Sequence, residues 1–284
     1  MDIKYSEMLS KKSQKLDELA LSLRNQYSNA KPFPHIQLDN FFSDQYLNLV
    51  LNEFPDLSYL NSSQNYKNKN EVKFANNDYR NFPNNIKIFF DFLNSETFLN
   101  FIQSLTSINE KLFSDKKLNG GGLHEIKSGG LLKVHTDFSK HPTNNLDRRI
   151  NVLIYLNKNW KEEYNGYLEL WDREMRECKQ RIQPSFNKMV IFSTTDFSNH
   201  GHPDAIKCPD EVSRKSIALY YFSSGRPKDE TIDSDMKNRT YFKNRFGFKN
   251  EVEEKKENIK VFLRKFSFYK KIKNFEKKYL RKKK

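Results

Sequence analysis

Residues 131–142 read LLKVHTDFSKHP, a short apolar run of strand-forming residues that ends in His135, Thr136 and Asp137. Successive side chains of a β-strand point to opposite faces, so His135 and Asp137 lie on one face, roughly 6–7 Å apart along the chain. An imidazole nitrogen and a carboxylate oxygen at this spacing suit a metal ion. The chain has six histidines, however, and a His-x-Asp triplet that arises by chance is usually a surface or core feature.

The sequence around this motif has the pattern of an all-β core. Between residues about 121 and 223, runs rich in Ile, Val, Leu, Tyr and Phe alternate with turn-forming or charged segments. The runs are GGLLKVHTD (129–137), RRINVLIYLN (148–157), GYLELW (166–171), FNKMVIFS (186–193) and RKSIALYYF (214–222). Strands of this length and spacing predict an antiparallel barrel or sandwich.

The N-terminal part has a different, mixed pattern. In chain order we expect a helix over 5–27, a turn and strand over 31–42, a helix capped by Ser43 and stopped at Pro55, a loop over 56–80, and one or two helices after Pro83. The loop is predicted from its content of Asn, Ser, Tyr and Lys. The helices should pack against the sheet.

The later strands supply the groups that a metal site would still need. A histidine and a carboxylate are two of the three ligands in the facial triad of non-haem Fe(II) oxygenases. The stretch FSTTDFSNHGHP (192–203) offers His200 and His202 as candidates for the second histidine. In the next run, alternation puts Arg214 and Ser216 on one face, where both can donate to a carboxylate.

Together these motifs resemble the prolyl 4-hydroxylase-like branch of the Fe(II)/2-oxoglutarate-dependent dioxygenases, over roughly residues 33–228. The resemblance lies in PFPHIQLDNFF, GGGLHEIKSGGLLKVHTDF, RRINVLIYLNKNWKEEYNGYLELWD, FSTTDFSNHGHPD and SRKSIALYYFS. It implies a mainly β (α+β) fold, a double-stranded β-helix of the jelly-roll type, with flanking N-terminal helices.

The same resemblance implies roles for single residues. His135 and Asp137 would be iron ligands, and His200 the third, with His202 as the alternative to His200.

Arg214 would hold the distal carboxylate of 2-oxoglutarate, with Ser216 beside it and Tyr155 in contact with the same group. His124 would lie in the pocket, as a core residue or a substrate contact. Asn165 stands where the family has a second glycine, a difference that concerns the turn and not the chemistry.

The activity implied is hydroxylation of a substrate coupled to conversion of 2-oxoglutarate and O₂ to succinate and CO₂, with ascorbate as reductant. The substrate is open between a prolyl residue of a protein and a small metabolite or glycan precursor. Two alternatives are a non-enzymatic or zinc-binding jelly roll, which would have four closed ligands and no use for Arg214, and a nucleic-acid-binding protein driven by its tail.

The net charge of +14 is concentrated at the C-terminus. Residues 260–284 carry twelve Lys and Arg and one Glu, a local charge of +11, which leaves +3 for residues 1–259. Aromatic and aliphatic residues recur there at spacings of three and four, which predicts a basic amphipathic helix. The apolar stripe of this helix could pack back on the β domain. If it does not, its partner would be an anionic membrane surface or, alternatively, an RNA backbone, although the near-neutral β region argues against a nucleic-acid-binding function.

From these features we predict three parts: a helical extension (1–32), a dioxygenase domain (33–228) with its jelly-roll core at about 121–223, and a basic tail (229–284). The N-terminus lacks the apolar segment of a secretory signal. Cys178 and Cys208 have no metal-binding spacing and suit reduced thiols. We therefore expect a cytoplasmic protein, peripheral at the membrane if the tail binds there.

Overall fold

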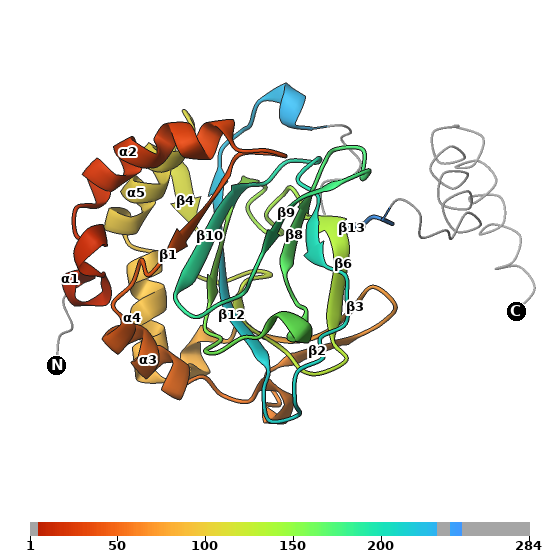
Figure 1. Ribbon diagram of the computed structural model, residues 1–284. Coiled ribbons are helices and arrows are strands. Elements are labelled where there is room, and N and C mark those ends of the chain that lie inside the picture. The colour runs from red at the N-terminus through yellow and green to blue at the C-terminus, as the bar shows by residue number, and fades with distance from the viewer. Residues whose placement is uncertain (1–4, 232–238, 246–284) are drawn as a thin grey trace, which may run out of the picture. The chain divides into compact units, whose positions relative to one another are not determined.

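The computed structural model describes residues 5–231 and 239–245 of the chain (Figure 1). The chain divides into two compact units, residues 1–243 and 244–284, and all described helices and strands belong to the first. The predicted amphipathic helix at 260–284 lies outside the described residues. Among the helices that are described, none has the length and apolar character needed to cross a bilayer.

The N-terminal third is mostly helical, as expected. Its α-helices are α1 (Tyr5–Met8), α2 (Leu16–Asn29), α3 (Asp44–Asn52), α4 (Asn84–Leu93) and α5 (Glu96–Thr106). Ser43 is the N-cap of α3, because its hydroxyl accepts a hydrogen bond from the Tyr46 amide at 3.4 Å. The segment predicted as one helix over 5–27 is two helices, since the Gln14 side chain donates to the carbonyls of Ser6 and Leu9 and ends the first.

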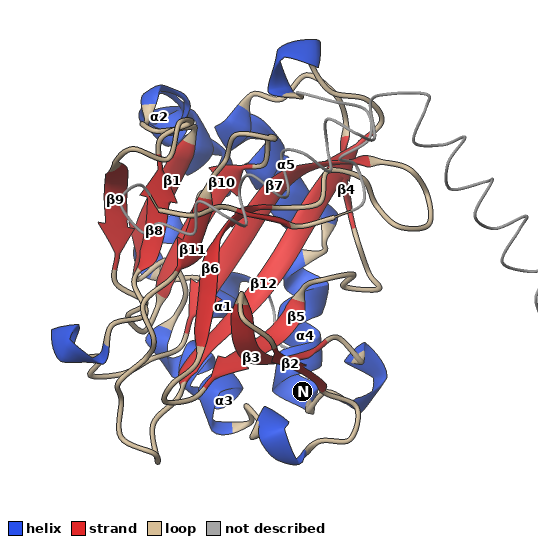
Figure 2. Cartoon of the chain, turned by 90° about the vertical axis from the view of Figure 1, so that its right-hand side faces the viewer, coloured by secondary structure: helices blue, strands red, loops and turns tan. Residues whose placement is uncertain are grey.

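The strands form one continuous antiparallel sheet that curls into a jelly roll, which confirms the predicted fold class (Figure 2). Its path runs β1-β10-β7-β12-β5-β3-β6-β11-β8-β9. The strands are β1 (His35–Asp39), β2 (Gln64–Lys67), β3 (Glu71–Asn76), β4 (Leu112–Ser114), β5 (Gly122–Ile126), β6 (Leu131–Thr136), β7 (Asp147–Tyr155), β8 (Leu168–Trp171), β9 (Cys178–Ile182), β10 (Lys188–Ser193), β11 (His200–His202), β12 (Arg214–Ser223) and β13 (Tyr241–Phe242).

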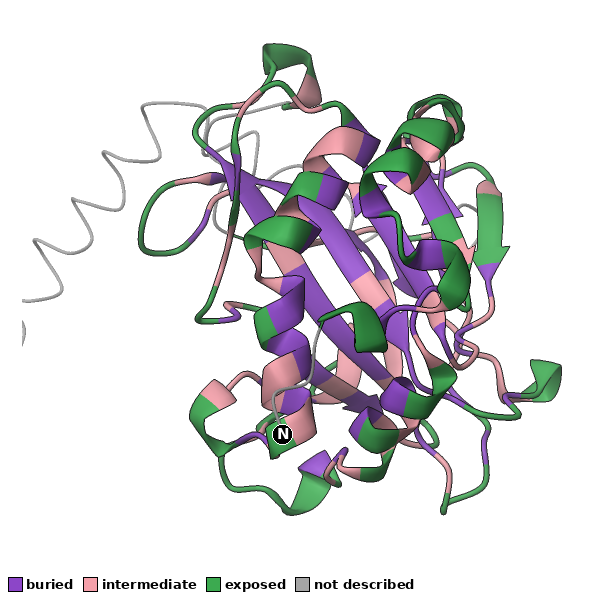
Figure 3. Cartoon of the chain, turned by 90° about the vertical axis from the view of Figure 1, so that its left-hand side faces the viewer, coloured by how far each residue is buried: buried purple, intermediate pink, exposed green. Residues whose placement is uncertain are grey.

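Alternation along the central strands separates two buried layers. Ile154, Ile191 and Ile217 belong to the main core cluster, which they share with residues of the helices. The helices cover this face of the sheet (Figure 1), and they carry both buried and exposed residues (Figure 3). Side chains on the opposite face, such as Tyr155 and Val190, lie in a second cluster with residues of β8. The interior between the two halves of the sheet is therefore separate from the helix-packed core.

The prediction of a loop over 56–80 was wrong. This stretch contains β2 and β3, and β3 joins the two halves of the sheet: Phe74 to Asn76 pair with β5, and Glu71 and Val72 pair with β6. The polar composition was misleading because β3 places Phe74 against the core while Lys73 and Ala75 take the interior face opposite.

The short strand β13 lies in the region predicted as tail. Tyr241 and Phe242 pair with Thr136 and His135 of β6, and the Phe242 ring centroid lies 5.6 Å from that of His135. The tail predicted from residue 229 thus contributes a strand beside the HTD motif. The boundaries of the three predicted parts stay predictions.

Candidate active site

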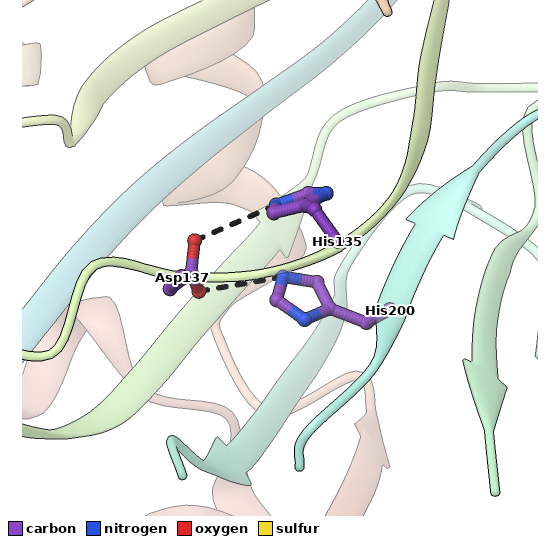
Figure 4. A group of neighbouring side chains, drawn as sticks. All are labelled: His135, Asp137 and His200. Carbon is purple, nitrogen blue, oxygen red and sulfur yellow. Dashed lines mark ion pairs between the residues drawn. The ribbon is translucent and has the colours of Figure 1, made fainter. Parts of the chain in front are cut away.

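Two histidines and an aspartate meet inside the jelly roll (Figure 4). His135 lies at the end of β6, Asp137 follows it, and His200 begins β11, where it is the direct partner of His135. The Nε2 atom of His135 lies 3.5 Å from Asp137 Oδ1, and that of His200 lies 3.4 Å from Asp137 Oδ2. Ligands at about 2.0–2.2 Å from one ion are themselves roughly 3 Å apart, so the group is close to the spacing that a divalent metal requires.

The hydrogen bonds of the two rings show which nitrogen would face a metal. Nδ1 of His135 lies 2.8 Å from the Lys133 carbonyl, and Nδ1 of His200 lies 2.9 Å from the Ser198 carbonyl. A carbonyl oxygen only accepts, so each Nδ1 carries a proton, and Nε2 is the ring nitrogen that faces Asp137. Burial lowers the pKa of His200 to about 4 and keeps that ring neutral. Acceptor atoms that converge in this way are suited to hold a cation.

The carboxylate is oriented by two residues that sequence reasoning missed. Asp137 Oδ2 accepts hydrogen bonds from Arg148 Nη2 at 3.0 Å and from Asn151 Nδ2 at 2.7 Å. Burial is the largest influence on its pKa and opposes ionisation. The neighbouring Arg148 guanidinium, followed by the His200 and His135 side chains, outweighs burial and holds the pKa of Asp137 well below its usual range. The carboxylate is therefore ionised without a metal.

Arg148 reaches the site because β7 contains a β-bulge. Tyr221 pairs with Ile150, but the next residue of β12, Phe222, pairs with Arg148, so one residue of β7 is extra. Regular alternation from Asn151 would have put residue 149 on the interior face. The bulge brings Arg148 there, where it is 1% exposed and its guanidinium carbon lies 3.3 Å from the Tyr220 ring centroid. The sequence RRINVLIYLN shows two adjacent arginines, but it does not show which of them faces the interior.

Gly201 explains how β11 approaches β6 so closely. A Cβ atom at this position would lie 2.8 Å from the Lys133 carbonyl oxygen and 2.9 Å from that of Leu132. The register of the two strands shifts between His200 and His202. Of the two candidate histidines, His200 reaches Asp137, and His202 is directed elsewhere in the interior.

The predicted cosubstrate residues also come together. Arg214 donates from Nε to the Gly166 carbonyl at 2.8 Å and from Nη2 to the Tyr155 hydroxyl at 3.2 Å. Ser216 pairs with Tyr155 on one side and with His124 on the other, so the three share the interior face. Gly166 approaches the arginine closely, because a Cβ there would lie 3.1 Å from Arg214 Cδ.

Arg214 is 4% exposed, yet within the part of the chain that the structure describes it forms no ion pair with a carboxylate. A buried guanidinium without a counter-ion is unfavourable, so an anionic ligand beside it would be strongly stabilised. The residues present therefore fit the distal carboxylate of 2-oxoglutarate. Tyr155 supports this fit: burial raises the pKa of its hydroxyl, which stays protonated and can donate.

Three further side chains share this interior. Burial, followed by the charges of Lys73 and Arg214, lowers the pKa of His124 to about 3. Burial and the charges of Arg214, Lys73 and His135 likewise lower the pKa of His202. Lys73 itself lies 3.2 Å from Glu71 on β3. The interior thus has a basic end that includes Arg214 and Lys73, and a metal-binding end at Asp137.

Fold and site define a jelly-roll domain with a candidate metal centre and a buried anion site, and comparison with known families agrees. Residues 121–222 match the model of the 2OG-Fe(II) oxygenase superfamily, where 2OG denotes 2-oxoglutarate. This part of the chain is therefore similar to the superfamily, in agreement with the resemblance inferred from the motifs of the sequence. The family implies Fe(II), 2-oxoglutarate and O₂ as reactants.

Relatives of this chain include prolyl hydroxylases. It is 31% identical over 88 residues to prolyl 3-hydroxylase OGFOD1 of Mus musculus, a match that covers 30% of this chain and only 16% of that protein. A prolyl hydroxylase of Trichoplax adhaerens, solved with a peptide fragment of the hypoxia inducible factor oxygen degradation domain, superposes with a TM-score of 0.56 at 20% identity, covering 77% of this chain and 96% of that one. A prolyl 4-hydroxylase structure from Phytophthora capsici gives 0.53 at 18% identity, covering 78% and 69%. At these identities the structural matches show the fold.

Proposed function

We propose that the protein is an Fe(II)- and 2-oxoglutarate-dependent dioxygenase in which His135, Asp137 and His200 hold the iron. The observation that carries this proposal is the convergence of two imidazole Nε2 atoms on one ionised carboxylate at 3.4–3.5 Å. The group has three members among residues 5–231 and 239–245, whereas a closed structural zinc site takes four ligands. Three ligands on one face leave positions for a chelating cosubstrate and O₂.

Bound Fe(II) would supply the redox chemistry by which O₂ and 2-oxoglutarate become succinate and CO₂ while a C–H bond of the substrate becomes C–OH. The chain's own residues prepare this step. Arg148 and Asn151 hold the Asp137 carboxylate, and the carbonyls of Lys133 and Ser198 fix the two imidazoles. Such supporting hydrogen bonds set the tautomer and direction of metal ligands.

Arg214, with Tyr155 and Ser216, would bind the distal carboxylate of 2-oxoglutarate. Its Nε is already fixed on Gly166, so the guanidinium is held in one orientation before the cosubstrate arrives. The apolar cluster around Val190, Phe192 and Leu170 borders the same interior and excludes water from it. Exclusion of water keeps reactive oxygen species from side reactions.

For the substrate we propose a prolyl residue of a protein, with ascorbate as the reductant. The support is the activity of two similar proteins: the mouse protein is a prolyl 3-hydroxylase, and the structure solved with a peptide is a prolyl hydroxylase. A proteolytic digest of cell extract treated with the iron-loaded protein and 2-oxoglutarate should contain peptides that gain one oxygen on proline. Oxygen gained only by small metabolites would refute the prolyl assignment.

The metal assignment is tested by anaerobic addition of Fe(II) and 2-oxoglutarate, which should produce a visible charge-transfer band. His135→Ala, Asp137→Ala and His200→Ala should each abolish it. His35→Ala is the matched control, because His35 is a buried histidine of β1 outside the group and should leave the band unchanged. A band that persists in all three ligand variants would show the triad to be wrong.

The anion site has its own test. Arg214→Lys keeps a charge but loses the planar fork, so its dissociation constant for 2-oxoglutarate should rise roughly 10- to 100-fold, because a hydrogen bond to a charged group contributes about 1.5–3 kcal/mol. Fe(II) affinity, measured separately, should be unchanged. If Arg214→Lys binds 2-oxoglutarate with the same dissociation constant as the parent, the distal carboxylate is held by another cation.

A further inference from the structure

His202 is buried in the interior with no partner for either ring nitrogen. Its exposed fraction is 3%, and neither Nδ1 nor Nε2 has a hydrogen-bond partner among the described residues. Other described side chains have a buried unpaired atom, but in His202 every polar atom of the side chain is unpaired. Burial of polar groups without partners is unfavourable, and such groups call for a ligand or a functional explanation.

The register of the strands gives the direction of this side chain. His202 pairs with Leu132 of β6, and Leu132 pairs on its other side with Glu71 of β3. Glu71 forms an ion pair with Lys73 on the interior face, so His202 faces the same interior. It does not belong to the metal-binding group, which contains His200 instead.

The neighbours of His202 place it along the path of the cosubstrate. Gly201 pairs with Glu169 of β8, so His202 lies beside the start of β8, and the Gly166 carbonyl just before that strand holds Arg214. A 2-oxoglutarate molecule that bound the metal through its 2-oxo acid end and Arg214 through its distal carboxylate would extend between these two groups and pass near His202. A neutral imidazole there offers one N–H donor to a carboxylate oxygen.

We propose that His202 is a cosubstrate-binding residue that donates a hydrogen bond to the distal carboxylate of 2-oxoglutarate, beside Arg214 and Tyr155. The inference rests on the proposed function and adds a selective role: it distinguishes a 2-oxo dicarboxylate from a 2-oxo monocarboxylate. His202 is then unpaired only until the cosubstrate arrives. Fe(II) binding does not depend on it.

The effect on the metal-free protein separates this role from a structural one. No hydrogen bond to the described chain is lost when His202 is replaced by Leu, which has a similar volume and no polar atom. His202→Leu should therefore unfold in urea at the same or a higher midpoint than the parent, while it binds 2-oxoglutarate more weakly. A residue that served only the fold would show the opposite pair of results.

The decisive experiment is an anaerobic titration of the Fe(II)-loaded full chain with 2-oxoglutarate and, separately, with pyruvate, which has the 2-oxo acid end but no distal carboxylate. His202→Leu should raise the dissociation constant of 2-oxoglutarate roughly tenfold, a change of about 1.4 kcal/mol, and leave that of pyruvate unchanged. His202→Gln, whose amide N–H reaches toward the position of Nε2, should recover most of the affinity. His35→Leu is the control and should match the parent for both ligands.

The possible failures are distinct. A parent that binds neither 2-oxo acid would overturn the proposed function together with this inference. A parent that binds 2-oxoglutarate no better than His202→Leu does would overturn the inference alone. Equal weakening of 2-oxoglutarate and pyruvate would place His202 at the chelating end and exclude the distal contact. If His202→Leu does not fold, His202→Ala, which also removes both ring nitrogens, takes its place with the same expectations for the binding of the two 2-oxo acids.

Discussion

The buried ion pair between Arg148 and Asp137 allows a quantitative test of how the site is assembled. Arg148 is 1% exposed and its Nη2 lies 3.0 Å from Asp137 Oδ2. In Arg148→Met the apolar stem can still pack between Phe138 and Tyr220, but the cation is lost. Among the described residues, Asp137 then keeps the hydrogen bond from the Asn151 amide, at 2.7 Å, and the two imidazoles nearby.

Loss of one partner from a buried pair leaves an uncompensated charge and costs about 3–5 kcal/mol. For a domain whose unfolding free energy is on the order of 5–15 kcal/mol, this is a large fraction. In the double variant Asp137→Asn/Arg148→Met neither charge remains. Its loss of unfolding free energy should therefore be smaller than the sum of the two single-variant losses by roughly 2–3 kcal/mol. The assay is urea unfolding of the metal-free protein at neutral pH in the presence of a chelator.

Arg149→Met is the matched control. The Arg149 guanidinium bonds Glu110 at 2.8 Å and Glu230 at 3.3 Å, and not Asp137. In a double-mutant cycle of Arg149→Met with Asp137→Asn, the losses of unfolding free energy should therefore add to within about 0.5 kcal/mol. The reasoning is refuted if Arg148→Met costs less than about 1 kcal/mol, or if the two cycles give the same coupling energy.

Three further expectations concern the strand contact, a buried histidine and the tail. Gly201→Ala should weaken Fe(II) binding roughly 10- to 100-fold, as for lost supporting groups of metal sites, because its Cβ would press on two carbonyls of β6; calorimetric titration giving parental affinity would contradict this. His124 has a pKa of about 3 in the folded chain against an ordinary value of 6.5, so its contribution to stability is complete above pH 6.5 and is lost as the pH falls toward 3. Urea unfolding should therefore show His124→Gln losing less stability between pH 7 and pH 5 than the parent, by at most about 2 kcal/mol, and equal losses would exclude this role. Truncation after Asn258 should abolish co-sedimentation with anionic liposomes at low salt and spare 2-oxoglutarate turnover, whereas equal sedimentation of both chains would refute membrane binding by residues 260–284.

Period-two alternation was enough to predict much of this site. It placed His135 with Asp137 and Arg214 with Ser216, because a regular strand determines which side chains share a face without reference to the rest of the chain. The same local pattern predicted the strands of the jelly-roll core. Ser43 could be assigned as a helix cap for the same reason, since a cap depends on the next few residues only.

The features that depend on irregular pairing were decided by the tertiary structure. The bulge in β7 selects Arg148 over Arg149 for the interior, and the pairing of β11 with β6 puts His200, not His202, opposite His135. Residues 71–76 became a strand because β5 and β6 offered edges to pair with, despite a polar composition typical of a loop. Bulges and strand pairing reflect hydrogen bonds and packing between segments far apart in the chain, and a local sequence pattern does not contain that information.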